Sequence, residues 1–258
     1  VNAEELKVKA IGEGANLGIT QAGRIAFALA GGRINTDFID NSAGVDCSDN
    51  EVNIKIALNK EMIEGRLTLD DRNALLVRMT DDVAALVLED NRLQALGLSI
   101  AERGGATNLA SYVRLIETFE GSKQLDRAVE GLASNEQLLR RAQDGKGLTR
   151  PELAVLLSTA KLALQDAIEH GSLGEDPGMG GELAAAFPKE MQAAEADAIA
   201  DHQLRREIVA TKLANRIVNR LGLIHPFELA EEEGCSLADL TSAFVIAERL
   251  FGVRQLWD

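Results

Sequence analysis

Two short segments near the start of the chain gather residue types that could contact a ligand. Residues 12–18 (GEGANLG) and 40–45 (DNSAGV) are rich in Gly and Asn, and each follows a short run typical of a strand. Gly lets a flat ligand approach the backbone closely, and an Asn amide both donates and accepts hydrogen bonds. Such turns are common where a cofactor lies across strand ends. Asn16 and Asn41 are therefore candidate binding residues, although Asn also suits a turn because it tolerates left-handed backbone.

The first segment could alternatively cradle a phosphate. Its spacing, Gly12-x-Gly14-x3-Gly18, is similar to a dinucleotide phosphate loop, and Asp37 or Asp40 would be the acidic residue that follows such a loop. A domain of that kind needs several further βαβ units. This chain turns helical instead, which argues against a phosphate role.

A hydroxyl and a thiol follow the second segment. Residues 48–51 (SDNE) fit a capping box, which predicts that Ser48 caps a helix. A hydroxyl there also suits a carboxylate ligand, because the free N–H groups and the helix dipole favour an anion. Cys47 lies beside two carboxylates, but no His near it in sequence could activate the thiol. We expect Cys47 to serve packing.

Composition excludes several classes of partner. Two distant cysteines and three scattered histidines form neither a disulfide framework nor a metal-ligand spacing, so we expect no metal. The formal net charge of −14 argues against a surface for nucleic acid or for an anionic membrane. We see no signal peptide and no apolar run long enough for a bilayer. We therefore expect a cytoplasmic protein with reduced thiols.

The elements that would position these residues change in kind along the chain. A strand over 7–11, a helix over 19–30 and a strand over 34–39 form one βαβ-like unit, which normally belongs to a larger parallel sheet. From Ser48 onward the apolar spacing is helical. The fold class is therefore mainly α: a short βαβ remnant of a dinucleotide-binding domain over 1–47, then a large C-terminal helical domain over 48–258. A possible internal boundary lies near 171–181, where Gly and Pro are frequent.

Several helices of the second part have local signals. The helix from Ser48 should bury Val52, Ile56 and Ile63, and His202 should be a cap or surface residue at the head of a helix. Thr149-Arg150-Pro151-Glu152 is typical of a helix start, with Pro in the first turn. Further helices are predicted over 80–99, 202–221 and 237–251.

Both Gly/Asn segments resemble motifs of one enzyme family. Residues 13–16 (EGAN), with Thr20 four residues later, are similar to the E-G-A-N-x-P-x-T segment of glutamate dehydrogenases. Residues 41–45 (NSAGV), with Ser48 three residues later, look like their N-A-G-G-V-x-x-S segment. Residues 149–156 and 202–220 resemble the large bacterial NAD-specific members in particular. The resemblance covers almost the whole chain.

The resemblance implies roles for four residues. Asn16 and Asn41 match positions that contact the nicotinamide-ribose end of NAD. Val45 and Ser48 match positions that line the glutamate side-chain pocket, where the Ser hydroxyl binds the γ-carboxylate. The chain departs from the family by Gly18, where Pro is usual, and by 42–43 (SA), where the family has Ala-Gly.

The resemblance also implies what is missing. The catalytic Lys and Asp, the substrate-binding lysines and the dinucleotide loop of the family have no counterpart here. We therefore expect the C-terminal part of a homo-oligomeric enzyme that converts L-glutamate, NAD and water to 2-oxoglutarate, ammonium and NADH, and an isolated chain without activity. The alternative is a non-catalytic helical module for interaction or oligomerisation.

Overall fold

The computed structural model describes residues 2–14 and 18–256, so the candidate residue Asn16 lies outside the described residues. The described chain is mainly helical, with one two-stranded parallel sheet near its start. This confirms the predicted fold class.

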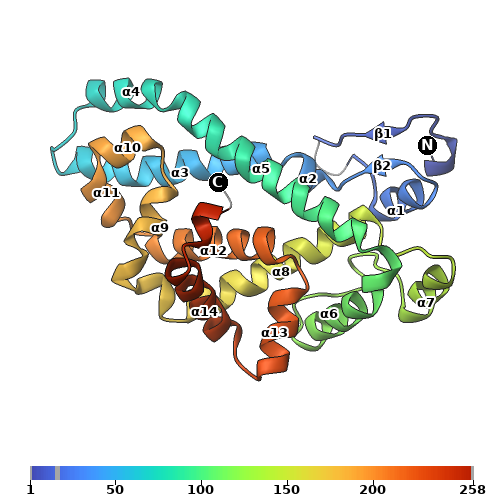
Figure 1. The fold of residues 1–258 in the computed structure, drawn as a ribbon. Coiled ribbons are helices and arrows are strands. Elements are labelled where there is room, and N and C mark those ends of the chain that lie inside the picture. The colour runs from blue at the N-terminus through green and yellow to red at the C-terminus, as the bar shows by residue number, and fades with distance from the viewer. Residues whose placement is uncertain (1, 15–17, 257–258) are drawn as a thin grey trace. The chain divides into compact units, whose positions relative to one another are not determined.

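The sheet and its connecting helix form the expected βαβ unit (Figure 1). β1 (Ala10–Ile11) pairs in parallel with β2 (Arg33–Ile34), and Ile11 lies opposite Ile34. Helix α1 (Gln21–Leu29) connects them and begins where the Thr20 side chain accepts a hydrogen bond from the Gly23 N–H. Both strands are shorter than predicted.

The predicted second strand over 34–39 is wrong beyond Ile34. The chain turns there into the short helix α2 (Asp37–Asp40), and Asn41 caps its C-terminus. Asn41 was expected to follow a strand directly, but it follows this short helix instead. In this helix the Asp37 carboxylate lies 3.2 Å from the Arg24 guanidinium, a tertiary contact that local strand propensity does not report.

The next helix begins six residues earlier than predicted. Helix α3 (Ser42–Ile63) starts directly after Asn41, so Ser48 lies inside the helix and the predicted capping box is wrong. The Glu51 carboxylate pairs with Lys55 one turn later and so supports the helix rather than a cap.

The buried face of α3 also differs from the prediction. Ile54, Ala57 and Leu58 are buried, whereas Val52 and Ile63 are 52% and 87% exposed. The buried side also includes two polar residues, Asn50 and Glu61, each with a hydrogen-bond partner. Apolar periodicity alone could not identify a face that is partly polar.

The remaining helices follow in sequence. They are α4 (Leu69–Arg78), α5 (Thr80–Arg103), α6 (Leu109–Gly121), α7 (Asn135–Gln143), α8 (Arg150–His170), α9 (Gly180–Ala185), α10 (Lys189–Ala194), α11 (Ala196–Ala200), α12 (Arg205–Leu221), α13 (His225–Glu233) and α14 (Leu237–Leu250). Short 3-10 helices lie at Ala3–Glu5, Gly105–Asn108, Leu173–Glu175, Pro177–Met179 and Val253–Leu256. The helices predicted from 80, from 149, within 202–221 and within 237–251 are confirmed.

The chain divides into two compact units. The first comprises residues 1–41, 93–163 and 217–240, and the second comprises 42–92, 164–216 and 241–258. In the core of the first unit, the rings of Phe119 and Phe227 meet edge to face with centroids 5.0 Å apart. Leu58, Leu75 and Phe187 are among the most deeply buried residues of the second. Within the described residues, no helix has both the length and the apolar composition needed to cross a membrane.

Candidate functional site

The first Gly/Asn turn is organised around a buried carboxylate, that of Glu13. Arg24 of α1 donates to Glu13 from Nε at 2.8 Å and from a terminal nitrogen at 2.7 Å, and the Ile19 N–H donates at 2.8 Å. The same guanidinium lies 3.2 Å from Asp37. Burial alone would raise the pKa of Glu13, but the hydrogen bonds from Arg24 and Ile19 outweigh it and hold the pKa below its ordinary value.

These contacts argue against a phosphate cradle in this turn. The Ile19 N–H, just before α1, already donates to the Glu13 carboxylate. The Gly23 N–H, in the first turn of helix α1, donates to the Thr20 hydroxyl. An incoming phosphate would have to displace a carboxylate that Arg24 also holds. Neither Gly12 nor Gly14 is required by a close contact, since a Cβ built on either would meet no atom within 4 Å.

A side chain joins the first turn to the end of α2. The Glu13 N–H donates to Asp40 Oδ2 at 2.8 Å, and Asp40 Oδ1 accepts from Asn35 Nδ2 at 2.6 Å. Asn41 follows Asp40 directly, and its own N–H donates to the Asp37 carbonyl at 2.8 Å. The structure thus brings the described part of the first turn beside the segment that contains Asn41.

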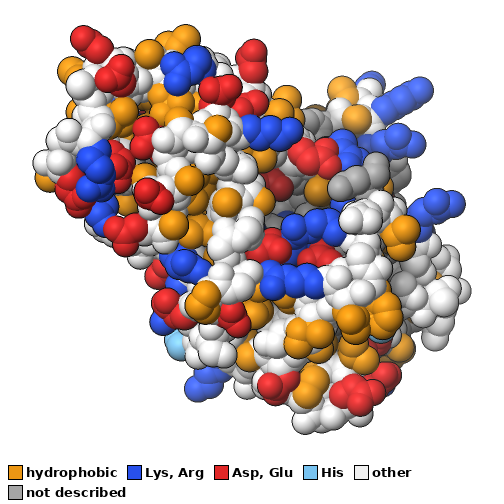
Figure 2. Space-filling view, turned by 60° about the vertical axis from the view of Figure 1, so that its left-hand side comes forward, with side chains coloured by type: hydrophobic (Ala, Val, Ile, Leu, Met, Phe, Trp, Pro, Cys, Tyr) orange, Lys and Arg blue, Asp and Glu red, His pale blue; other side chains and the backbone are white. Residues whose placement is uncertain are grey.

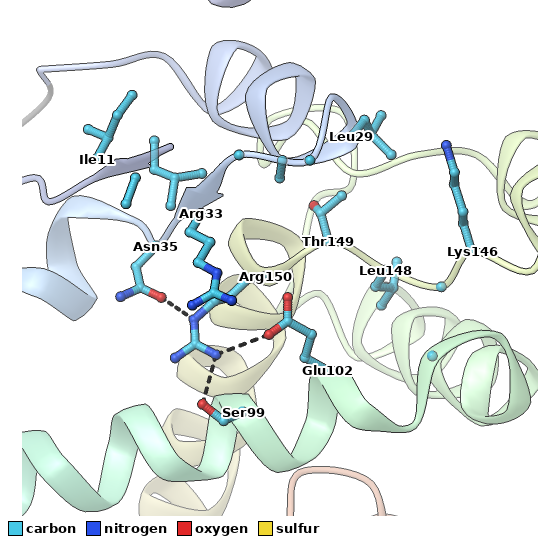
Figure 3. Close-up of a pocket in the computed structure, with 17 residues that line it drawn as sticks. Ile11, Leu29, Arg33, Asn35, Ser99, Glu102, Lys146, Leu148, Thr149 and Arg150 are labelled. Carbon is cyan, nitrogen blue, oxygen red and sulfur yellow. Dashed lines mark hydrogen bonds and ion pairs between the residues drawn. The ribbon is translucent and has the colours of Figure 1, made fainter. Parts of the chain in front are cut away.

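Arg150, the first residue of α8, extends this polar network (Figure 3). Its Nε donates to Asn35 Oδ1, one terminal nitrogen donates to Ser99 at 3.0 Å and to Glu102 at 3.3 Å, and the other donates to the Ala95 carbonyl at 3.0 Å. A single guanidinium therefore connects the end of β2 to α5. The residues that Arg150 contacts are far from it in the sequence, so no local sequence pattern could predict these hydrogen bonds.

A pocket of about 930 Å³ opens beside Arg150. Its walls come from the two strands, the turn before β2, the end of α5 and residues 146–150. Arg33 and Lys146 also line it, and among the described residues neither side chain has a hydrogen-bond or ion-pair partner. Figure 3 shows Arg33 extending toward Arg150, and Lys146 at the opposite end of the lining residues drawn. Asn41 does not line this pocket.

Val45 and Ser48 lie three residues apart in α3 and so share one face of the helix. Val45 is 54% exposed, and Ser48 is exposed as well. The Ser48 hydroxyl donates to the Gly44 carbonyl over a long 3.4 Å, its one hydrogen bond within the described residues. Because Ser48 is inside the helix, the neighbouring N–H groups belong to the helix ladder. A carboxylate here would be bound by the hydroxyl and not by free N–H groups.

His202 and the two cysteines were the other side chains with potential chemistry. His202 is buried and not a surface residue: its Nε2 lies 3.0 Å from the Asn53 carbonyl and its Nδ1 accepts from the Leu204 N–H, so the proton belongs on Nε2. Cys47 is an exposed free thiol, so the expectation that it serves packing is wrong, and Cys235 is a half-buried free thiol. Among residues 2–14 and 18–256, no group of three His, Cys, Asp or Glu side chains could hold a metal ion.

Comparison with known proteins identifies the family. Residues 1–101 match the family model described as bacterial NAD-glutamate dehydrogenase, catalytic domain, and residues 145–258 match that of the glutamate dehydrogenase C-terminal region. Relatives named NAD-specific glutamate dehydrogenase come from Pseudomonas aeruginosa (45% identical over 97% of this chain), Halomonas elongata (42% over 100%) and Mycobacterium tuberculosis (40% over 100%). The chain spans 16% of the length of each relative. It belongs to the bacterial NAD-specific glutamate dehydrogenase family.

Proposed function

We propose that this chain supplies one side of the active site of an NAD-dependent glutamate dehydrogenase, within a longer protein. That enzyme would convert L-glutamate, NAD and water to 2-oxoglutarate, ammonium and NADH. In this proposal Asn41 and Asn16 contact the nicotinamide-ribose end of NAD, and Val45 and Ser48 contact the glutamate side chain. The names of the relatives support the activity, and the motif resemblance supports the roles of the residues.

The observation that carries the substrate role is the exposed pair on α3. An apolar side chain and a hydroxyl occupy one face within the first two turns of the helix. This pair matches the two ends of a glutamate side chain, whose methylene groups need an apolar contact and whose γ-carboxylate needs a donor. The long hydrogen bond from Ser48 to its own helix leaves the hydroxyl available for a stronger acceptor.

The cofactor role rests on the polar network beside Asn41. Asp40 ties the first turn to the end of α2, so the residue that follows it is held at the carboxyl side of the sheet. An Asn amide there can donate to and accept from a ribose or a carboxamide. NAD, when bound, supplies the hydride acceptor. The contacts in the first turn argue against a phosphate cradle there, so in this proposal the pyrophosphate is bound elsewhere in the longer protein.

The chain orients substrate and cofactor in this proposal and does not move the proton. No residue here matches the catalytic Lys or Asp that the resemblance implies for the family. Oxidation of an amine needs a positioned group to accept the proton. We therefore assign that group to the remaining part of the longer protein.

The proposal is tested by two substitutions in the longer protein. Ser48→Ala should raise the KM for glutamate about tenfold or more, with little change in the KM for NAD, because it removes a hydrogen bond to a charged group. Asn41→Ala should do the reverse. Thr118→Ala is a matched control, since Thr118 is another exposed helical hydroxyl that donates to the carbonyl four residues earlier. Unchanged kinetics in both test variants would leave the helical interaction module as the better reading.

A further inference from the structure

The pocket beside Arg150 has an excess of positive charge. Its charged lining residues are three cations, Arg33, Lys146 and Arg150, and one carboxylate, Glu102. Glu102 pairs with Arg150 at 3.3 Å, so no carboxylate of the lining remains for the other two cations. The chain as a whole has a net charge of −14. The pocket is therefore a local positive site in an acidic protein, and its field favours an anion.

The charged groups of Arg33 and Lys146 are available for a ligand. Both side chains are exposed, and among the described residues neither has a hydrogen-bond or ion-pair partner. A free guanidinium offers five N–H donors and a free ammonium offers three. Arg150 differs, because it donates to Asn35, to Ser99 and to the backbone and thus holds the pocket wall together. Two free cations around one hollow can bind a single ligand between them.

Close packing holds the backbone next to each of these two cations. Gly32 precedes Arg33, and a Cβ built on Gly32 would lie 2.2 Å from the ring of Phe27. Gly147 follows Lys146, and a Cβ built there would lie 2.5 Å from the Gly105 carbonyl oxygen. A side chain larger than that of glycine does not fit at either position without a shift of its neighbours. The segments that carry both cations are therefore held in place before a ligand arrives, which lowers the cost of binding.

The size of the pocket and its apolar lining indicate an organic ligand. The volume of about 930 Å³ is much larger than a single inorganic anion needs and falls within the range of small-molecule sites. Leu29 and Leu148 also line the pocket, and in the view of Figure 3 they lie between Arg33 and Lys146. A ligand that reaches both cations would thus place its middle part against apolar side chains.

We propose that this pocket binds a small organic anion with a negatively charged group at each end, one bound by Arg33 and the other by Lys146. Carboxylate and phosphate groups both suit these donors. Asn41, Val45 and Ser48 do not line the pocket. The ligand is therefore neither the glutamate nor the nicotinamide end of NAD in the proposed function, and the site is an addition to that function.

Calorimetric titration of the longer protein tests the site without reference to activity. The probes are adipate, with a carboxylate at each end, and fructose 1,6-bisphosphate, with a phosphate at each end, and NAD is present to fill the coenzyme site. At least one probe should bind saturably, and Arg33→Glu and Lys146→Glu should each weaken it about tenfold or more, because each removes a charge-assisted contact. Lys189→Glu is the matched control, an exposed lysine of α10 outside the pocket. The probe that binds more tightly identifies the anionic groups.

Three results would overturn the proposal. Equal affinity in the wild type and in both pocket variants would place the ligand elsewhere in the longer protein. Inorganic phosphate that binds as tightly as the two probes would contradict a ligand with two charged ends. The third result is binding of neither probe. If Arg33→Glu and Lys146→Glu then also lowered the Tm while Lys189→Glu did not, an acidic part of the longer protein would be the occupant of the pocket.

Discussion

Glu13 and Arg24 form a charge pair in the first turn, with side chains only 4% and 5% exposed. The sequence singled out the Gly and Asn residues around Glu13, because small residues and amides mark turns. It could not single out the pair, since two charged residues eleven positions apart have no periodicity that reports burial. The pair nevertheless decides what the turn can bind, because its carboxylate already occupies the Ile19 N–H.

Removal of one partner of this pair should strongly destabilise the first unit. Arg24→Met would leave Glu13 buried without its main donor, and we expect a loss of about 3–5 kcal/mol in the free energy of unfolding. Arg140→Met is the control, since its ion pair with Glu136 is 72% and 76% exposed and should contribute about 1 kcal/mol or less. Denaturant unfolding measures both. Equal losses in the two variants would contradict a special role for the buried pair.

His202 gives a pH dependence with a defined sign. Burial lowers the pKa of His202 in the folded state, although its hydrogen bond to the Asn53 carbonyl opposes this. The unfolded state then binds the proton first, so this group leaves stability intact above about pH 6.5 and reduces it as the pH falls below that value. The decline between pH 7 and 5 should be smaller in His202→Gln. A decline of equal size in the variant would show that other groups cause it.

At the scale of elements, local signals predicted some helix ends and missed others. The start of α8 was predictable because its determinants are adjacent: Thr149 donates from its N–H and hydroxyl to Glu152, and Pro151 fits the first turn. The start of α3 was not, although a capping-box pattern begins at Ser48. The helix instead begins at Ser42, where the partner is Asn91, a residue that only the tertiary structure brings near.

The start of α8 should be sensitive to the loss of one carboxylate. Glu152 is fully buried and accepts hydrogen bonds from Thr149. One terminal nitrogen of Arg141 also donates to both Glu152 oxygens, at 2.9 Å to Oε1 and 2.7 Å to Oε2. Glu152→Ala should lower the free energy of unfolding by about 3 kcal/mol or more, because Arg141 loses its partner. Glu152→Gln keeps the shape and should lose less. A loss below about 1 kcal/mol for the alanine variant would contradict this account of the helix start.

At the scale of the whole molecule, composition limits partners more than it identifies them. The net charge of −14 does not form one large acidic field on the face drawn in Figure 2, where acidic and basic side chains are interspersed. The family could be inferred because two motifs and their spacing are specific. The division of the chain into two compact units could not be inferred from the sequence. It depends on contacts between distant segments, such as 1–41 with 93–163 and 217–240 in the first unit. The predicted division at residue 47 stays a prediction.

The chain alone should not catalyse the reaction. The family resemblance implies that the catalytic Lys and Asp belong to another part of the longer protein, so we expect no NADH formation from L-glutamate and NAD, as followed by absorbance of NADH. The longer protein under the same conditions is the control. Turnover by the isolated 258-residue chain would show that a proton acceptor is present within it.

The proposed function depends above all on recognition of the γ-carboxylate of glutamate by Ser48. The most direct measurement compares L-glutamate with L-norvaline, which has the same carbon chain without that carboxylate, in the longer protein and in its Ser48→Ala variant. We expect Ser48→Ala to lower the ratio of the two kcat/KM values about 10- to 100-fold, because only glutamate loses a charge-assisted hydrogen bond. An unchanged ratio, with both substrates affected equally or not at all, would contradict the claim.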